Sequence, residues 1–229
     1  MSKLVTKNSF LAKVKSKSKP AKKVDLAKVR KAVERAPRLL FTMDATGSRS
    51  HTWELAQEIT LSMFDVMPGE LEIALGYHGG GKLKEITPFK TSKEYFKEKV
   101  SGVYCDSGWT DLCSILRAAT EIRELNALIY IGDAFEESEE TAYEIARILA
   151  EKKTPCFMFI EGENRAATEV FRKIAKITGG ALFPFENNSP KDVSDKLAAI
   201  AAFAGGGKQL LSKMAKQLPS AKLLLEELK

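Results

Sequence analysis

The amino-acid sequence predicts an α/β fold, in which helices cover both faces of a mainly parallel, six-stranded sheet. Three observations support this prediction. Short apolar segments alternate along the chain with longer segments of helical periodicity, as in a doubly wound sheet. Residues 127–133 and 154–162 have the nearly continuous apolar character of strands that are buried on both faces. Glycines at 79–81 join two strand-like segments through a turn that is too short to connect parallel neighbours.

The strand segments can be placed in order along the chain. They are 38–44 (RLLFTMD), 71–78 (LEIALGYH), 83–89 (LKEITPF), 127–133 (ALIYIGD), 154–162 (TPCFMFIEG) and 181–186 (ALFPFE). The third segment contains Pro88, whose missing N–H is tolerated at the edge of a sheet. The expected fold is therefore a Rossmann-like, doubly wound sheet with one antiparallel edge strand.

Helical patterns fill the intervals between the strands and also precede the first one. They cover 24–34, 51–67, 92–100, 110–125, 139–153, 165–180 and 191–204. Ser138 and Asn164 are placed to cap two of these helices at their N-termini, and Gly179 is placed to end one of them. Pro190 stands at the first position of the last of these helices, where its missing N–H costs nothing.

Charge divides the chain into unequal parts. Residues 1–38 carry thirteen Lys or Arg and two acidic residues, whereas the rest of the chain has a net charge of −5. We expect a basic N-terminal arm with a short helix at 1–36, a main domain at 37–204, and a glycine hinge with C-terminal amphipathic helices at 205–229. Its most basic segment, KVKSKSKPAKK at 13–23, can bind nucleic acid or an anionic surface, although no aromatic residue for base stacking is interleaved in it. A solvated arm without a partner is the alternative.

The bulk composition favours a cytoplasmic globular protein. The 229 residues are 44% hydrophobic and 29% charged, which is ordinary for such a protein. No apolar run approaches the roughly 20 residues that a membrane span needs. The basic N-terminus has no apolar segment followed by a small-residue cleavage site, so no secretory signal is expected. Three scattered cysteines predict reduced thiols rather than a disulfide framework or a metal knuckle.

Oxygen-bearing side chains follow the strands of this predicted sheet. Asp44 ends the first strand and is followed by Thr46 and Ser48, Thr110 begins a helix, and Asp133 ends the fourth strand. Ligands of open α/β sheets collect at the carboxyl edge, where these three segments should meet. Two carboxylates and three hydroxyls suit a hard divalent cation, Mg²⁺ above all, with Mn²⁺ or Ca²⁺ as substitutes. The other interpretation is that these residues only cap turns and helices.

These motifs resemble those of the von Willebrand factor A (VWA) domain family. The sequence has DATGS at 44–48, GWT at 108–110 and IGD at 131–133, in the family's order, and the resemblance covers roughly 37–204. It implies a metal-ion-dependent adhesion site (MIDAS), at which a partner's Asp or Glu completes the coordination of the cation. The segments IYIGDAFEE, FMFIEGEN and FRKIAKITGGALF are similar to those of a little-characterised bacterial intracellular subgroup.

The resemblance has departures and further implications. Thr46 stands where serine is commoner, which retains the hydroxyl, and Ala134 stands where a glycine often follows the aspartate. Intracellular bacterial members often accompany a AAA+ ATPase or a chaperone, so the resemblance implies a partner of that kind. Trp109, Arg49 and His51 lie beside the predicted site and are candidates for contact with the partner.

Three other features are expected to have no part in the site. GYHGGGKL at 76–83 imitates a phosphate-binding loop, but Leu83 stands where that motif needs Ser or Thr, and a strand follows instead of a helix. His78 is expected in a surface turn. The acidic run at 136–140 is expected to be solvated charge at a helix N-terminus, with repulsion of acidic partners or recruitment of a basic one as the alternative.

Three functions are compatible with these patterns. The first is a metal-dependent protein-interaction module without enzymatic activity. The second is a nucleic-acid-associated protein that binds through its basic arm, which predicts steep salt dependence. The third is a metal-dependent hydrolase, which is disfavoured because only Arg49 offers a phosphate-binding cation near the site and no general base is evident.

Overall fold

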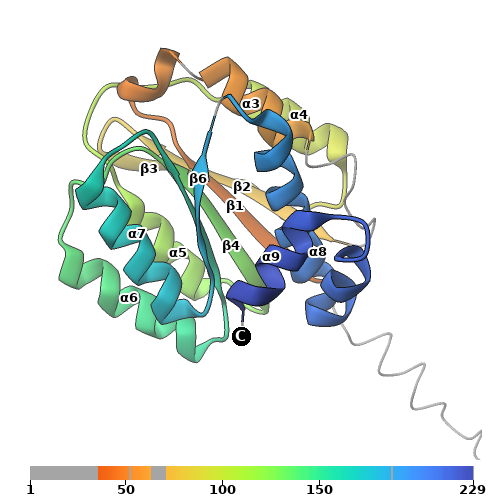
Figure 1. Ribbon diagram of the computed structural model, residues 1–229. Helices are drawn as coiled ribbons and strands as arrows, with labels where there is room; N and C mark the ends of the chain where they lie inside the picture. Colours follow the sequence, from red (N-terminus) through yellow and green to blue (C-terminus); the bar gives the residue numbers. More distant parts are fainter. Residues whose placement is uncertain (1–35, 52, 63–70, 187, 229) are drawn as a thin grey trace, which may run out of the picture. The chain divides into compact units, whose positions relative to one another are not determined.

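A six-stranded sheet forms the centre of the structure, a computed structural model in which residues 36–51, 53–62, 71–186 and 188–228 are described (Figure 1). The strands are β1 (Arg38–Asp44), β2 (Glu72–Gly79), β3 (Lys82–Ile86), β4 (Leu125–Gly132), β5 (Cys156–Glu161) and β6 (Leu182–Phe185). Their order in the sheet is β3-β2-β1-β4-β5-β6. All neighbouring pairs are parallel except β2 and β3, which are antiparallel. The predicted fold class, with its antiparallel edge strand, is confirmed.

Helices connect the strands and pack on both faces of the sheet. They are the short 3-10 helix η1 (Gly47–His51) and the α-helices α3 (Trp53–Ser62), α4 (Lys93–Ser101), α5 (Leu112–Glu121), α6 (Glu139–Glu151), α7 (Arg165–Thr178), α8 (Pro190–Met214) and α9 (Pro219–Glu227). Helices α3, α4, α8 and α9 contribute to the hydrophobic cluster on one face, and α5, α6 and α7 to the cluster on the other. Figure 1 shows these two layers on either side of the strands.

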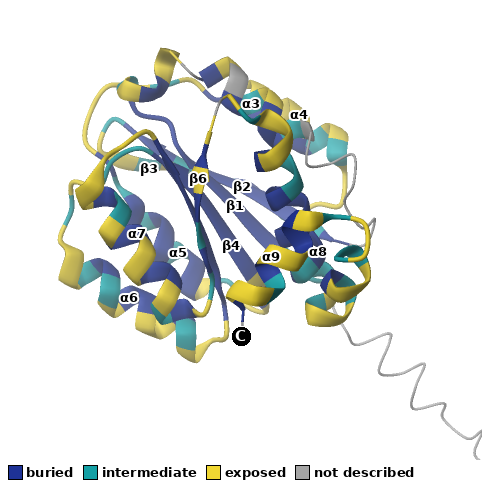
Figure 2. Cartoon of the chain, viewed as in Figure 1, coloured by how far each residue is buried: buried dark blue, intermediate teal, exposed yellow. Residues whose placement is uncertain are grey.

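The central strands are buried on both faces, as their apolar sequences predict. In β4, Ala127, Ile129 and Ile131 belong to the first cluster, and Leu128 and Tyr130 belong to the second. This alternation follows from the period of two in a strand. Figure 2 shows the strands as mainly buried, whereas the helices expose the sides that face away from the sheet.

Capping side chains fix the ends of α6 and α7. The Ser138 hydroxyl accepts a hydrogen bond from the Thr141 N–H at 3.3 Å, and the Asn164 side chain accepts one from the Ala167 N–H at 3.1 Å. Gly179 ends α7 in the left-handed conformation, with φ of 73°. These three predicted end signals are confirmed.

A kink at a glycine divides helix α8. Two helices meet at Gly207, which lies in the expected glycine hinge and whose φ of 60° and ψ of −161° are not helical. Leu211 and Leu224 of α8 and α9 are buried in the same cluster as the strands. The chain thus kinks at Gly207, and the buried leucines hold the helical segments that follow it against the sheet.

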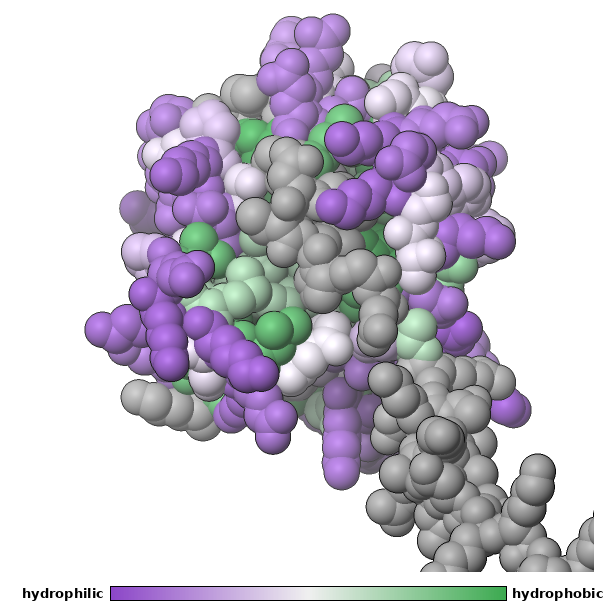
Figure 3. All heavy atoms as spheres, turned by 90° about the vertical axis from the view of Figure 1, so that its right-hand side faces the viewer, coloured by the Kyte–Doolittle hydropathy of each residue, from purple (hydrophilic) through white to green (hydrophobic). Residues whose placement is uncertain are grey.

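Hydrophilic side chains cover most of the face drawn in Figure 3, apart from the grey residues.

Within the part of the chain that the structure describes, no helix is both long and apolar enough to cross a membrane. The predicted basic arm at 1–36, with its helix at 24–34, falls almost entirely outside the described residues.

Candidate functional site

The candidate site lies where the connections of the sheet change direction. From β1 the chain crosses to β2 on one side, whereas β4, β5 and β6 follow one another on the other side. The carboxyl ends of β1 and β4 are therefore neighbours at a switch point, where open α/β sheets bind ligands. Met43 pairs with Ile131. Asp44, the last residue of β1, and Asp133, the first residue after β4, therefore lie at the ends of adjacent strands.

The first segment of the site is the loop from β1 into η1. Asp44 is fully buried, and its Oδ1 accepts a hydrogen bond from the Thr46 N–H at 2.7 Å. The hydroxyls of Thr46 and Ser48 are 3.1 Å apart, so this turn brings one carboxylate and two hydroxyls together. The Ala45 carbonyl accepts from the Asp106 N–H at 2.8 Å, which attaches the turn to the segment before α5.

Two carboxylate oxygens in the site are buried without a hydrogen-bond partner in the described part of the chain. Asp44 Oδ2 and Asp133 Oδ1 have no hydrogen-bond partner among the described residues. Buried polar atoms are nearly always hydrogen-bonded, because an unsatisfied group loses its hydration without compensation. The orphaned oxygens come from the two aspartates that the sequence predicts as cation ligands.

Electrostatics at Asp44 indicate the same need for a positive charge. Burial raises the pKa of the Asp44 carboxyl from 3.8 to about 7. Hydrogen bonding by Thr46 and the charge of Arg49 oppose this increase, and the charge of Asp133 adds to it. The two carboxylates are thus close enough to repel each other.

The donor set fits a hard divalent cation. Among the described residues, no group of three or more His, Cys, Asp and Glu side chains is arranged to hold a metal ion. A cation at this edge would therefore depend on hydroxyl oxygens in addition to Asp44 and Asp133. Oxygen donors of this kind, with water completing the shell, are typical of Mg²⁺.

Divalent-cation affinity is expected to fall as the pH is lowered below about 7. Because the pKa of Asp44 is raised to about 7, its carboxyl is increasingly protonated below that pH in the cation-free protein. A cation must then displace a proton, which costs about tenfold in apparent affinity per pH unit. Calorimetric titrations with MgCl₂ at pH 6, 7 and 8 measure this dependence, and equal affinities at all three values would contradict ligation by Asp44.

The buried imidazole of His78 connects the site to the start of α5. Its Nδ1 accepts a hydrogen bond from the Asp111 N–H at 3.2 Å and lies 3.9 Å from Asp44 Oδ1. Since Nδ1 is an acceptor, the ring proton is on Nε2, which is 2.9 Å from the Tyr130 hydroxyl. Burial lowers the pKa of His78 to about 4, so the ring is neutral at pH 7. The His78 ring thus lies between Asp44 and the backbone of Asp111, the residue after Thr110.

The expectation that His78 lies in a surface turn is wrong. His78 is fully buried at the carboxyl end of β2. Its position in an alternating strand pattern, rather than its neighbouring glycines, was the signal that could have located it. His51 is exposed, in keeping with its candidacy for partner contact.

Arg49 also differs from its prediction as a partner-binding residue. Its side chain is 1% exposed, and its Nε donates to Glu161 Oε2 at 2.7 Å. Another guanidinium nitrogen donates to the Asp44 carbonyl, and the guanidinium lies over the Trp53 ring at 5.3 Å. A buried arginine in this position braces η1 against the end of β5 and is inaccessible to a partner.

Trp109 is presented on a rigid support. Its side chain is 72% exposed, although its carbonyl accepts a hydrogen bond from the Gly81 N–H at 3.0 Å. The Gly80 N–H likewise bonds to the Asp106 carbonyl at 3.2 Å. The β2–β3 turn thus holds the segment that carries Trp109.

Lys82, the lysine of the imitated phosphate-binding motif, is exposed on edge strand β3. A strand follows the glycines, so the helix N-terminus that a phosphate-binding loop needs is absent at this position, as the sequence predicts.

Thr110 is brought to the same edge, where its N–H and its hydroxyl proton already have acceptors. It is 4% exposed, and its hydroxyl donates to Glu137 Oε2 at 2.6 Å. Glu136 contacts both the backbone and the hydroxyl of Thr110. The expectation of solvated charge at 136–140 is therefore wrong for Glu137, which is half-buried, whereas Glu136 is exposed but also bonded to Thr110. Contacts of these two residues with Thr110 have no signal in the local sequence.

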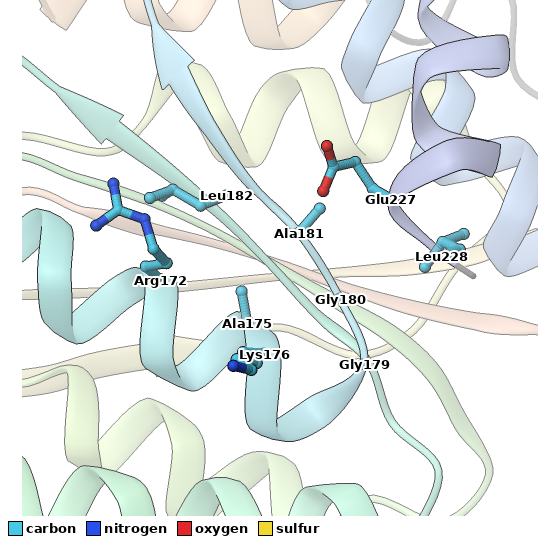
Figure 4. Close-up of a pocket in the computed structure, with 9 residues that line it drawn as sticks. All are labelled: Arg172, Ala175, Lys176, Gly179, Gly180, Ala181, Leu182, Glu227 and Leu228. Carbon is cyan, nitrogen blue, oxygen red and sulfur yellow. The ribbon is translucent and has the colours of Figure 1, made fainter.

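A separate pocket lies at the opposite edge of the sheet, between the end of α7, the start of β6 and α9 (Figure 4). It has a volume of about 410 Å³, and its charged lining residues are Arg172, Lys176 and Glu227. Arg172 already forms an ion pair with Glu169. Figure 4 shows the side chains of Arg172, Lys176 and Glu227 spread apart rather than directed to one point. This pocket is therefore a weaker candidate than the carboxyl edge.

Comparison with known proteins identifies the fold. No protein-family model matches the sequence, and no curated protein matches it either. Solved structures do match. A von Willebrand factor type A protein from Catenulispora acidiphila has a TM-score of 0.63 at 16% identity, over 75% of this chain and 43% of that one. The SpRpn10 VWA domain has a TM-score of 0.57 at 12% identity, over 70% of this chain and 95% of that one.

The human COPII-coat protein Sec24c is also similar, with a TM-score of 0.56 at 10% identity, over 72% of this chain and 32% of that one. The chain thus spans less than half the length of the C. acidiphila protein and of Sec24c. At these identities the similarity establishes a VWA-like fold.

Proposed function

We propose that this chain is a metal-dependent protein-interaction module, in which Asp44, Thr46, Ser48, Thr110 and Asp133 hold Mg²⁺ at the carboxyl edge of the sheet. A carboxylate from a partner protein completes the coordination shell. The observation that carries the proposal is the pair of buried oxygens on Asp44 and Asp133 that have no hydrogen-bond partner within the described segments. The VWA-like fold, which often mediates protein–protein interaction, supports it.

The cation supplies a centre of positive charge for an incoming carboxylate, and the side chains of this site set its strength. Asp44 and Asp133 contribute negative charge, whereas the hydroxyls of Thr46, Ser48 and Thr110 are neutral. Fewer anionic ligands leave more positive charge for an anionic partner. The balance of two carboxylates and three hydroxyls therefore favours Asp or Glu on the partner over a neutral side chain.

Binding rather than catalysis is the activity that these residues favour. His78, the histidine nearest to Asp44, is buried, and both ring nitrogens are engaged by Asp111 and Tyr130. Arg49 is held by Glu161 and the Asp44 carbonyl. Neither side chain is in a position to act as a general base or to bind a phosphate. We propose that the protein acts as an adhesion module, with a AAA+ ATPase or a chaperone as the class of partner.

The proposal is tested by selecting linear peptides from a random library on the immobilised protein in MgCl₂. We expect enrichment of sequences with Asp or Glu, and loss of binding when EDTA is added or when the acidic residue is changed to its amide. Selected peptides that bind equally well in EDTA would contradict metal-mediated recognition.

Replacing Trp109 by alanine is expected to weaken binding of a selected acidic peptide about tenfold or more without changing Mg²⁺ affinity. Exposed, rigidly supported aromatic residues supply large contact area at little entropic cost. Ile148, which is 44% exposed on α6, provides a control because its substitution by alanine removes apolar surface far from the carboxyl edge. Equal peptide affinity for wild type and Trp109→Ala would place the partner surface elsewhere.

A further inference from the structure

Two glutamates of the β4–α6 loop form a clamp on Thr110. Glu137 Oε2 accepts the Thr110 hydroxyl proton at 2.6 Å, and Glu137 Oε1 accepts the Cys113 N–H at 2.8 Å. Glu136 Oε2 accepts the Thr110 N–H at 3.0 Å, and the Glu136 N–H donates to the Thr110 hydroxyl at 2.9 Å. Four hydrogen bonds thus join residues more than twenty positions apart. We call this pair of residues the glutamate clamp.

The clamp replaces the usual cap of α5. Asp111, at the N-cap position, makes no side-chain capping hydrogen bond. Its carboxylate instead accepts the Leu83 N–H at 2.8 Å. The Cys113 N–H, in the first turn of α5, is satisfied by Glu137 from another loop. A carboxylate is stabilised at a helix N-terminus, so this interaction fixes the β4–α6 loop against α5.

The clamp also joins the two halves of the candidate cation site. Asp133 and Glu137 lie in the same short loop, four residues apart. Fixing Glu137 to the start of α5 therefore limits the distance between Asp133 and Thr110. The four hydrogen bonds of the clamp thus connect the loop that carries Asp133 to the segment that carries Thr110.

The hydrogen bonds of Thr110 leave room for a cation. A hydroxyl has one proton and two lone pairs. The Thr110 proton is given to Glu137, and one lone pair accepts the Glu136 N–H. One lone pair remains. Donation to a carboxylate raises the electron density on the hydroxyl oxygen, as outer carboxylates do for metal-bound histidines.

We propose that Glu137 is a positioning residue of the cation site: its carboxylate orients and polarises the Thr110 hydroxyl and so increases the affinity for the divalent cation. The carboxylate of Glu136 accepts only the Thr110 N–H, and the Glu136 contact with the Thr110 hydroxyl is made by its backbone N–H. This inference rests on the proposed function, because it assumes that Thr110 is a cation ligand. It adds an outer carboxylate that the five predicted ligands do not include.

The experiment is a calorimetric titration of the full chain with MnCl₂ and MgCl₂. We expect Glu137→Gln to lower the affinity about 10-fold to 100-fold, the range found for outer-sphere partners of metal ligands. The matched control is Glu136→Gln, which removes the same charge from the same loop but retains an amide oxygen that can accept the Thr110 N–H. Its affinity should stay within about threefold of wild type, since a single outer charge that touches no ligand hydroxyl has a modest effect.

The role of the hydroxyl is isolated by repeating the titration in a second background. In Thr110→Val the hydroxyl is absent, so Glu137→Gln should cause no further loss of affinity. Thr110→Ser keeps the hydroxyl and should bind the cation like wild type, which also provides a test if Glu137→Gln fails to fold. Melting temperatures in EDTA separate loss of the helix cap from loss of cation affinity.

The outcomes distinguish this inference from the proposed function. Equal losses in Glu136→Gln and Glu137→Gln, or an undiminished loss in the Thr110→Val background, would overturn the role of Glu137 while the cation site stands. Wild-type affinity in Thr110→Val would do the same. If the wild-type protein binds neither Mn²⁺ nor Mg²⁺, both the inference and the proposed function fail.

Discussion

Replacing Asp44 by asparagine is expected to abolish binding of Mg²⁺ and Mn²⁺ while leaving the cation-free protein at least as stable as wild type. Asparagine can keep the hydrogen bond that Asp44 Oδ1 accepts from the Thr46 N–H. It places a neutral amide where a buried oxygen has no partner among the described residues. The charge that attracts the cation is lost, together with the repulsion from Asp133.

The two effects of this substitution have opposite signs, which makes the test sharp. Loss of one of only two carboxylate ligands should lower cation affinity by at least about 100-fold. In EDTA at pH 8, removal of a buried carboxylate whose desolvation outweighs the stabilisation by Thr46 and Arg49 should leave the melting temperature unchanged or raise it. A variant that unfolds would instead indicate that Asp44 has a structural role.

Asp106 supplies the matched control for Asp44. Asp106 is exposed, lies beside Thr46 in an isolated bridge, and forms an ion pair with Lys84 at 2.6 Å. Asp106→Asn removes a carboxylate from the same edge of the sheet without removing a predicted ligand. Calorimetry should therefore show a loss of cation affinity in Asp44→Asn but not in Asp106→Asn, and only Asp44→Asn should show a raised melting temperature if the two differ. Similar cation affinities for Asp44→Asn and wild type would refute the assignment of the site.

The parts of the fold that follow from local patterns could be predicted from the sequence. The apolar run 127–133 and the helix signals at Ser138, Asn164 and Gly179 depend on residues close together in the chain. The sheet edge that gathers Asp44 and Asp133 follows from topology, because parallel strands all end at the same edge. These predictions needed no knowledge of which side chains touch.

The predictions for Arg49 and His78 were wrong because both residues contact partners that are distant in the sequence. Arg49 pairs with Glu161, which is 112 positions away, and His78 contacts Tyr130, 52 positions away. A charged or polar residue next to a turn is usually exposed, so the local sequence favoured the surface for both. Their burial is compensated by partners that only the folded chain supplies.

The glutamate clamp was missed for the same reason. Acidic residues at the start of a helix are stabilised by the helix dipole, so the local sequence predicts solvated charge for the run at 136–140. Glu136 and Glu137 precede α6, but they act on α5. Asp111 stands at the N-cap position of α5 without a side-chain capping hydrogen bond, which leaves the first turn of α5 to Glu137. Only the structure reveals this.

Replacing Gly108 by alanine is expected to produce the largest loss of stability among the substitutions at this edge. Gly108 has φ of 147°, which side chains rarely adopt, and an added Cβ would lie 2.6 Å from the Gly80 Cα. The obstructing atom belongs to the backbone, so no side chain can rotate away. The loop must separate from the β2–β3 turn, breaking the hydrogen bonds from Gly80 to Asp106 and from Gly81 to Trp109.

Gly162 offers a control that isolates the steric contact. Its φ is 75°, but an added Cβ would meet nothing within 4 Å. Gly162→Ala therefore bears the cost of an unfavourable backbone conformation alone, about 1–2 kcal/mol. Gly108→Ala adds a forced displacement of packed backbone and should lose about 3–4 kcal/mol in total, given the usual cost of overpacking. Urea denaturation of both variants in EDTA measures the difference in the free energy of unfolding.

The same displacement should reach the candidate site, because Trp109 and Thr110 directly follow Gly108. If the β2–β3 turn holds this segment in place, Gly108→Ala lowers cation affinity and acidic-peptide binding as well as stability, whereas Gly162→Ala changes only stability. A rigid support also explains how an exposed tryptophan can adjoin a buried threonine. Equal free energies of unfolding for the two variants, with cation affinity intact in both, would show that the turn does not position the segment that carries Thr110.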